Sequence, residues 1–254
     1  MPDILPGAEP ASYEGGPHGA LVLHGFTGCP QSMRPLAEAF AAAGFATELP
    51  RLPGHGTSLD DMKATTWADW SKTAEQAYDE FAARCAARNG KVVVAGLSMG
   101  GTLTAWVGAT RPDVAGLVFV NPAIEPAPEN VYAIARQMFD QGVEIAPAVG
   151  NDVAKPGVTE LAYDGVPVAS LLSMFDAQQE LAAKLGDVRC PSLVLTSRQD
   201  HVVAPRNSDY LAERLGRPVE RVWLDRSFHV ATIDYDAEDI QARAVEFARK
   251  VTAS

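Results

Sequence analysis

The sequence predicts an α/β protein built on a mostly parallel sheet that helices cover on both faces. Short, continuous apolar runs, typical of buried strands, alternate with longer segments whose apolar residues recur every three to four positions. Parallel strands are buried on both faces, so they form uninterrupted apolar runs rather than polar–apolar alternations. The chain has 254 residues, 47% of them hydrophobic, which is enough for a sizeable core.

The chain begins with an arm, a strand and a helix. Residues 1–17 are rich in Pro, Gly and Ala, which is typical of an extended or loosely ordered segment. The apolar run His18–Leu23 predicts the first strand. Pro30–Gly44 has apolar residues on one helical face, with Ser32 as the expected cap and the final glycine as the end of the helix.

The next two expected strands flank a long helix. Phe45–Leu49 predicts a strand, and the sequence PRLPGHG at residues 50–56 predicts a turn-rich loop. Thr66–Asn89 has apolar residues at three- and four-residue steps, which predicts a helix. Val92–Gly96 predicts a buried strand, and the helix after it ends at Arg111 because a proline follows.

The remainder of the chain supplies three more strands and two more helices. Val114–Val120, Ser192–Thr196 and Val219–Leu224 are short apolar runs that predict strands. Helical periodicity predicts helices near Arg206–Leu215 and at Glu238–Val251.

One long segment interrupts this alternation. Between Pro122 and Cys190 the sequence contains many apolar residues but no clear strand–helix unit. A connection of this length inside a compact domain is usually a lid or a small subdomain. We therefore expect a helical cap at residues 124–188, inserted into an α/β core formed by residues 1–123 and 189–254. The alternative is a set of peripheral packing helices with no role at the functional site.

The motif that carries chemistry is Gly96-Leu97-Ser98-Met99-Gly100, between an expected strand and an expected helix. A serine on such a tight turn has its hydroxyl exposed at the end of the strand. A side chain in place of either glycine would collide with the neighbouring strand or helix. The pattern and its context predict that Ser98 is a nucleophile.

A serine hydroxyl needs a base to take its proton, and the base needs an acid to orient it. His229 follows the last expected strand, and Asp200 follows the strand before it. The carboxyl ends of parallel strands meet at one edge of a sheet, so Ser98, Asp200 and His229 are expected to converge. Two alternatives stay open, namely His201 as the base and Asp225 as the orienting acid.

The tetrahedral intermediate of acyl transfer requires two hydrogen-bond donors for its oxyanion. The backbone N–H of Met99, directly after the nucleophile, is the first candidate. The turn His24-Gly25-Phe26 follows an earlier strand, so the backbone N–H of Phe26 is the second candidate.

Several segments together resemble the α/β-hydrolase superfamily, namely LVLHGFTG, LPRLPGHG, GLSMGGT, DHVV and SFHVATIDYD. Within it they are most similar to bacterial monoacylglycerol lipases and small carboxylesterases, over nearly the whole chain after residue 18. The resemblance implies Ser98 as nucleophile, Asp200 as acid, His229 as base and a cap over an acyl pocket. It implies no metal and no cofactor, and the short N-terminal arm leaves little room for the early strands of that fold.

The expected activity is hydrolysis of carboxylic esters through an acyl-enzyme on Ser98, with a monoacylglycerol as the preferred substrate. The alternatives are a general carboxylesterase, a C–C or amide hydrolase, a haloperoxidase-like enzyme, and a ligand-binding protein on the same fold. The resemblance in TELAYDGVPVASL makes Glu160 a candidate for binding a glycerol hydroxyl. Ile145, Leu171 and Phe175 are expected to line the acyl pocket.

The composition argues against some partners. The formal net charge of −11 disfavours nucleic acid and anionic membrane surfaces as electrostatic partners, although an apolar cap would still allow transient contact with a lipid interface. No apolar run is long enough for a transmembrane helix, and the first residues lack the features of a signal peptide. Cys29, Cys85 and Cys190 are widely spaced, which is typical of reduced thiols in a cytoplasmic protein.

Overall fold

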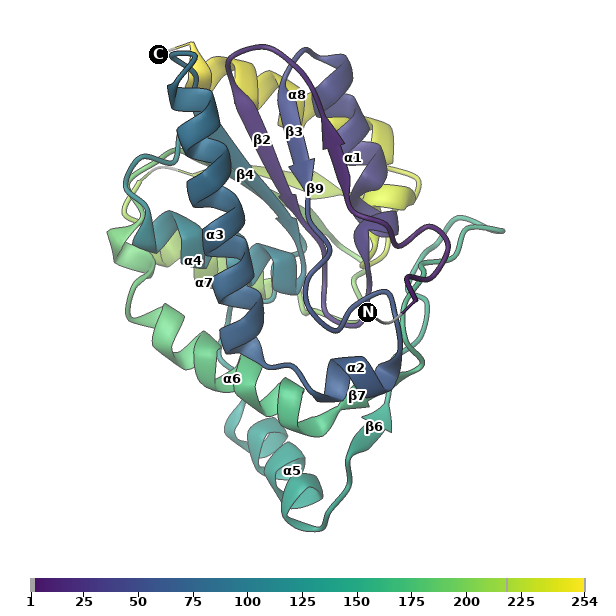
Figure 1. Cartoon of the computed structure of the whole chain (residues 1–254). Coiled ribbons are helices and arrows are strands. Elements are labelled where there is room, and N and C mark those ends of the chain that lie inside the picture. Colours follow the sequence, from purple (N-terminus) through teal and green to yellow (C-terminus); the bar gives the residue numbers. More distant parts are fainter. Residues whose placement is uncertain (1–2, 218, 254) are drawn as a thin grey trace.

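The sheet confirms the expected fold class. The computed structural model describes residues 3–217 and 219–253, which contain a seven-stranded sheet (Figure 1). Its strands are β1 (Ala11–Tyr13), β2 (Gly19–Leu23), β3 (Ala46–Leu49), β4 (Val92–Leu97), β5 (Gly116–Val120), β8 (Ser192–Ser197) and β9 (Val219–Leu224). Their spatial order is β1-β3-β2-β4-β5-β8-β9. β1 pairs antiparallel with β3, and the other neighbouring strands pair in parallel.

Helices cover the sheet on both faces (Figure 1). α1 (Pro30–Ala42) and α8 (Ala237–Thr252) pack on one face, and α3 (Trp67–Ala86), α4 (Met99–Thr110) and α7 (Arg206–Arg214) pack on the other. Successive side chains of a strand point to opposite faces, so alternate residues of the central strands enter two separate apolar cores. Among the described residues, no helix combines the length and apolar character that a membrane span requires.

The N-terminal arm is more ordered than the sequence predicts. Residues 1 and 2 lie outside the described part of the chain, but β1 pairs with β3 so that Ala11 lies opposite Leu49. The N–H of Leu5 also donates to the carbonyl oxygen of Gly56 at 2.9 Å. A three-residue strand is too short to show a periodic pattern, and tertiary pairing forms it instead.

The prediction that Ser32 is the N-cap residue of α1 is wrong. Cys29 occupies the N-cap position and Pro30 lies in the first turn. Ser32 lies inside the helix, where its hydroxyl donates to the Cys29 carbonyl oxygen at 3.3 Å. Proline presets the backbone angle of a first helical residue, and it therefore starts the helix two positions before the serine.

The other expected strands and helices are confirmed, with ends that differ by at most three residues. The sequence prediction missed three short helical segments because each is shorter than two turns of α-helix. They are α2 (Leu59–Lys63) and the 3₁₀ helices Leu185–Asp187 and Ala231–Ile233.

The connection between β5 and β8 lies beyond the carboxyl ends of the strands (Figure 1). It contains the helices α5 (Glu129–Asp140) and α6 (Val168–Ala182), which accounts for its helical character. It also contains β6 (Ile145–Pro147), paired antiparallel with β7 (Gly165–Pro167), which the sequence did not predict. Each of these strands has only three residues, too few to show an alternating pattern.

α5 is the element farthest from the sheet in Figure 1. It contributes Ala135 to a small apolar cluster with Val168 and Leu172, whose buried members belong to neither main core. Its outer face exposes Ile134 and Phe139 to solvent. The helix is therefore attached mainly through α6 rather than through the sheet.

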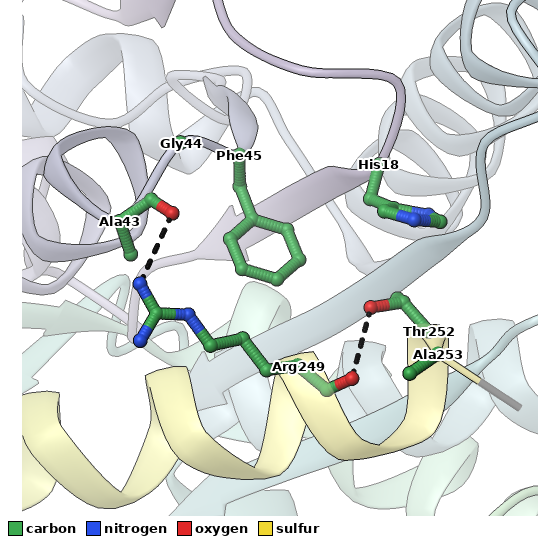
Figure 2. Close-up of a pocket in the computed structure, with 7 residues that line it drawn as sticks. All are labelled: His18, Ala43, Gly44, Phe45, Arg249, Thr252 and Ala253. Atoms are coloured by element: carbon green, nitrogen blue, oxygen red, sulfur yellow. Dashed lines mark hydrogen bonds between the residues drawn. The ribbon is translucent and has the colours of Figure 1, made fainter.

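A surface pocket of about 340 Å³ lies at the amino ends of β2 and β3 (Figure 2). His18 and Phe45, which directly precede these strands, contribute to its lining. Arg249 of α8 also lines it, and the Arg249 guanidinium donates to the Ala43 carbonyl oxygen at 3.3 Å. Ser98 follows the carboxyl end of β4, so this pocket lies at the opposite edge of the sheet from the expected nucleophile.

Candidate active site

Ser98 stands on a sharp turn between β4 and α4. Its backbone angles, φ 56° and ψ −119°, lie outside the regions that residues with a side chain ordinarily occupy. The Ser98 N–H donates to the Val120 carbonyl oxygen at 3.1 Å, and the Ser98 carbonyl oxygen accepts from the Ala123 N–H at 3.1 Å. The end of β5 therefore fixes the strained turn on both sides.

The two glycines of the motif are sterically required, as the sequence predicts. A Cβ on Gly96 would lie 2.1 Å from the carbonyl oxygen of Gly100 in the following helix. A Cβ on Gly100 would lie 2.2 Å from the carbonyl oxygen of Leu23 in the neighbouring strand β2. Only glycine at both positions lets β4, α4 and β2 approach this closely.

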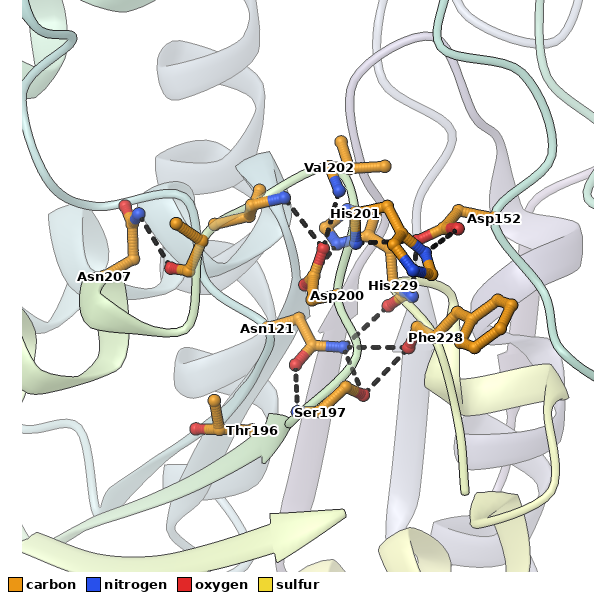
Figure 3. A network of polar contacts seen from close by, with 12 residues as sticks. Asn121, Asp152, Thr196, Ser197, Asp200, His201, Val202, Asn207, Phe228 and His229 are labelled. Carbon is orange, nitrogen blue, oxygen red and sulfur yellow. Dashed lines mark hydrogen bonds and ion pairs between the residues drawn. The ribbon is translucent and has the colours of Figure 1, made fainter. Parts of the chain in front are cut away.

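Asp200 and His229 form a hydrogen-bonded pair on the loops after β8 and β9 (Figure 3). Asp200 Oδ2 lies 2.8 Å from His229 Nδ1, and both side chains are almost completely buried. Asp200 Oδ1 accepts from the backbone N–H groups of Val202 at 2.9 Å and Val203 at 2.7 Å. Since the carboxylate acts as an acceptor for Nδ1–H, His229 Nε2 is left with the free lone pair of a base.

Asn121 holds the loop that carries His229. Its side-chain amide donates to the His229 carbonyl oxygen at 2.7 Å and to Ser197 Oγ at 3.0 Å, and its amide oxygen accepts from the Ser197 N–H at 2.7 Å (Figure 3). We did not identify Asn121 from the sequence. Its place after a strand, at the edge where Asp200 and His229 were expected, is the signal that could have revealed it.

The charges around His229 favour its protonated form. Burial lowers the pKa of the imidazole, but the hydrogen bond and charge of Asp200 oppose burial, and the carboxylates of Glu160 and Asp152 act in the same direction as Asp200. The net effect is a pKa above its ordinary value of 6.5. An imidazole of this kind accepts a proton readily, and the buried carboxylate beside it stabilises the resulting imidazolium cation.

The turn with Phe26 lies beside Ser98. A Cβ built on Gly25 would lie only 3.4 Å from Ser98 Cβ, so the backbone of this turn passes close to the serine. The Phe26 ring packs edge-on against Trp70, with 5.5 Å between the ring centroids. Met99 is the first residue of α4, where backbone N–H groups have no partner within the helix.

His24 supports the same turn from within the core. Its Nδ1 lies 3.0 Å from the Gly25 carbonyl oxygen, and its Nε2 accepts from the Leu52 N–H at 3.1 Å. These contacts fit a neutral ring protonated on Nδ1. Burial, together with the neighbouring His55 and Arg51, holds the pKa of His24 well below its ordinary value, so this histidine is a structural brace.

His201 and Asp225, the alternatives for the base and the acid, make other contacts. His201 Nδ1 lies 2.8 Å from Asp152 Oδ1, away from Asp200 (Figure 3). Asp225 is exposed and pairs with Arg198 at 2.7 Å. The buried acid–base pair of this edge is therefore Asp200 with His229.

The candidate substrate residues fall into two groups. Glu160 is partly buried beside the Phe26 turn, where a Cβ on Gly28 would lie 2.7 Å from Glu160 Oε1. Burial raises the pKa of this carboxyl group, against the charge of His229 and a hydrogen bond from Ser32. Leu171 and Phe175 of α6 are partly buried and pack against the core that contains α4, whereas Ile145 is 38% exposed on the outer strand β6.

Residues 151–163, which we call the strap, attach the β5–β8 connection to the core. Gln31 of α1 binds the strap on both sides: its amide nitrogen donates to the Thr159 carbonyl oxygen at 3.2 Å, and its amide oxygen accepts from the Leu161 N–H at 3.0 Å. The Tyr163 hydroxyl accepts from the Thr57 N–H at 2.8 Å and donates to the Gly54 carbonyl oxygen at 2.9 Å. The strap is therefore attached to α1 and to the loop between β3 and α2.

Asp234 attaches the strap to the histidine loop. Its buried carboxylate accepts from the N–H groups of Ala154 at 2.7 Å, Lys155 at 2.9 Å and Phe228 at 2.9 Å. Asp152 also contacts this loop, through the His229 N–H at 3.0 Å. We identified neither aspartate from the sequence. Asp234 lies in the quoted motif SFHVATIDYD, but Asp152 has no local pattern that could have revealed it.

A parallel sheet with a serine held in a strained turn after a central strand, and with an acid and a base on later loops, is the architecture of the α/β-hydrolases. The sequence profile of the serine aminopeptidase S33 family matches residues 17–236, so the chain belongs to this family.

Individual proteins similar to this chain include lipolytic enzymes. The chain is 44% identical over 250 residues to the thermostable monoacylglycerol lipase of Bacillus sp. (strain H-257), covering 97% of this chain and 96% of that protein. A structure solved for the metagenome-derived lipolytic enzymes LipS and LipT is 40% identical, with a TM-score of 0.89 over 98% of this chain and 100% of that one. The monoacylglycerol lipase of Paleococcus ferrophilus, 20% identical with a TM-score of 0.80 over 96% of this chain and 99% of its own, shares the fold.

Proposed function

We propose that the protein is a serine esterase that hydrolyses monoacylglycerols to glycerol and fatty acid. The observation that carries the proposal is the buried hydrogen bond between Asp200 and His229 at the edge of the sheet where the strained Ser98 turn ends β4. The 44% identity to a monoacylglycerol lipase over almost the whole chain supports this class of substrate.

In the acylation step, Ser98 Oγ attacks the ester carbonyl carbon while His229 Nε2 takes the hydroxyl proton. Asp200 stabilises the imidazolium cation that forms. The backbone N–H groups of Phe26 and Met99 hold the oxyanion of the tetrahedral intermediate. The intermediate collapses when its bond to the alcohol oxygen breaks, and the alcohol leaves with the proton from His229. Ser98 then carries the acyl group.

Deacylation repeats these steps with water in place of the serine. His229 takes a proton from the water, whose oxygen attacks the acyl carbon, and the same N–H groups hold the second oxyanion. When this intermediate collapses, the proton returns to Ser98 and the fatty acid is released. Each residue is therefore regenerated after one turnover.

Residues 124–188 form the cap in this proposal. Glu160 binds a hydroxyl of the glycerol, and Leu171 and Phe175 of α6 contact the acyl chain. Glu160 suits that role because it is a partly buried carboxyl group beside the Phe26 turn. Ile145 lies on the outer strand β6, so its contact with the acyl chain is at the rim of the cap.

The cap also offers a surface for transient contact with lipid. Its exposed large apolar side chains are Val131, Ile134, Phe139, Ile145 and Val149. Exposed apolar side chains favour partition to an interface rich in monoacylglycerol, from which substrate enters. We assign the protein to the cytoplasm, since all three cysteines, each within the described residues, are buried and free.

Labelling with a serine-directed fluorophosphonate, followed by peptide mass spectrometry, tests the mechanism. We expect one adduct on Ser98 and none in Ser98→Ala, which keeps the fold but lacks the nucleophile. An adduct on another serine would refute the assignment.

Hydrolysis rates for monoacylglycerols and simple alkyl esters of matched chain length test the substrate. We expect a higher kcat/KM for the monoacylglycerols because only they present hydroxyl groups to Glu160. Equal values would demote the protein to a general carboxylesterase.

A further inference from the structure

Asp152 of the strap presents a buried carboxylate to both catalytic loops (Figure 3). Its Oδ2 accepts from the backbone N–H of His229 at 3.0 Å and from the backbone N–H of His201 at 3.2 Å. Its Oδ1 lies 2.8 Å from His201 Nδ1. The Asp152 carbonyl oxygen also accepts from the Val230 N–H at 3.1 Å. Asp152 therefore binds both the loop that carries His229 and the loop that carries Asp200.

These contacts of Asp152 fix the positions of Asp200 and His229 relative to each other. His201 directly follows Asp200, so the N–H that Asp152 binds belongs to the peptide next to the acid. On the other loop it binds the N–H of His229 itself. The separation of Asp200 and His229, 2.8 Å between Oδ2 and Nδ1, thus depends on a carboxylate that touches neither side chain of the pair.

We propose that Asp152 is a positioning residue for His229: its carboxylate aligns the base with Asp200, and its negative charge stabilises the imidazolium formed when Ser98 attacks. The proposal rests on the catalytic roles assigned above. In this proposal His229 is an active base only while the strap is bound to the core, because Asp152 loses its contacts with the loops of Asp200 and His229 if the strap detaches.

The charge environment agrees with this role. The groups that face His229 are Asp200 from the loop after β8, and Glu160 and Asp152 from the strap. All three raise the pKa of the imidazole, against burial. His201, the side-chain partner of Asp152, is 56% exposed and closes the solvent side of the cluster, packed edge-on against Phe228 with 4.5 Å between centroids.

Asp152→Asn removes the negative charge of the side chain and keeps its size and shape. The amide oxygen can take the place of Oδ2 and accept both backbone N–H groups. The amide nitrogen can then donate to His201 Nδ1 when the ring carries its proton on Nε2 instead. Asp152→Glu retains the charge but displaces the carboxylate by one methylene. Asp225→Asn is the matched control, because Asp225 is an exposed carboxylate on the loop after β9 that pairs with Arg198.

The assay is the rate of inactivation by a fluorophosphonate as a function of pH, which requires no knowledge of the natural substrate. We expect the acid limb of Asp152→Asn to move about 0.5–1 pH unit lower than wild type, since removing a nearby negative charge lowers the pKa of His229. We expect Asp152→Glu to keep the wild-type limb but lose about tenfold or more of the plateau rate, because misplacement of a base is costly. Asp225→Asn should match wild type in both.

Each outcome decides the proposal. An Asp152→Asn limb that coincides with wild type refutes the electrostatic role, and a wild-type plateau in Asp152→Glu refutes the positioning role. If Asp152→Asn shows no cooperative unfolding transition, the Asp152→Glu plateau still tests the alignment. Failure of the wild-type protein to react at Ser98 would instead refute the proposed function, so the two failures are distinguishable.

Discussion

Replacing Tyr163 by phenylalanine tests how firmly the strap is fixed. The change deletes one hydroxyl that accepts from the Thr57 N–H at 2.8 Å and donates to the Gly54 carbonyl oxygen at 2.9 Å. Each neutral hydrogen bond contributes about 0.5–1.5 kcal/mol, and the two partners are left without a protein partner in a partly buried place. We therefore expect Tyr163→Phe to lower the free energy of unfolding by about 1–3 kcal/mol.

Urea unfolding at 25 °C, followed by tryptophan fluorescence, measures this change. The matched control is Tyr132→Phe in α5, which removes an exposed hydroxyl that donates to Asp176 at 2.8 Å. Its unfolding midpoint should stay at the wild-type value, because water replaces the lost partner. If both variants unfold at the wild-type midpoint, the Tyr163 hydroxyl does not hold the strap and the anchoring described above is wrong.

Three further predictions concern the site. Because the pKa of His229 is raised, we expect the acid limb of kcat/KM to lie above pH 6.5: the imidazole stays protonated to higher pH, and a protonated imidazole cannot act as a base. A pH–rate profile with a midpoint below 6.5 would contradict the charge environment described for His229. On the pH plateau, Glu160→Gln should raise KM for monoacylglycerols about 10- to 100-fold, which corresponds to the loss of a hydrogen bond to a charged group. KM for simple alkyl esters should stay at the wild-type value, and steady-state kinetics on both substrates check this. Gly100→Ala should prevent soluble expression or lower the free energy of unfolding by more than about 3 kcal/mol, because its Cβ would lie 2.2 Å from the Leu23 carbonyl oxygen; wild-type urea unfolding would show that the turn can relax.

Local patterns carried most of the fold prediction. The strand–turn–helix around Ser98 could be predicted because two glycines at fixed spacing reflect two close backbone approaches, and both approaches are present. The pairing of Asp200 with His229 followed from topology alone, since residues after adjacent parallel strands meet at one edge. These features depend on short sequence windows or on strand order, which a single sequence reveals.

The parts that could not be predicted depend on partners far away in the chain. β1 exists because β3 offers it an edge, and its own three residues carry no signal. Asp152 gains its place from contacts with His201 and His229, 49 and 77 residues away. No spacing rule identifies such a residue, because the geometry that brings it to the site is that of the whole connection.

The separate apolar cluster beneath α5 has a consequence for how enzymes of this kind diversify. Residues from Glu129 to Pro147 pack on α6, pair with β7 and bind Lys63 of α2 through Glu144, whereas the strap is attached to α1 and to the histidine loop. Changes in the outer helix and β6 therefore leave the hydrogen bonds of the strap in place. We therefore expect substitutions in α5 and β6 to alter the rim of the cap, while Leu171 and Phe175 of α6, the proposed acyl contacts, and Ser98 keep their positions.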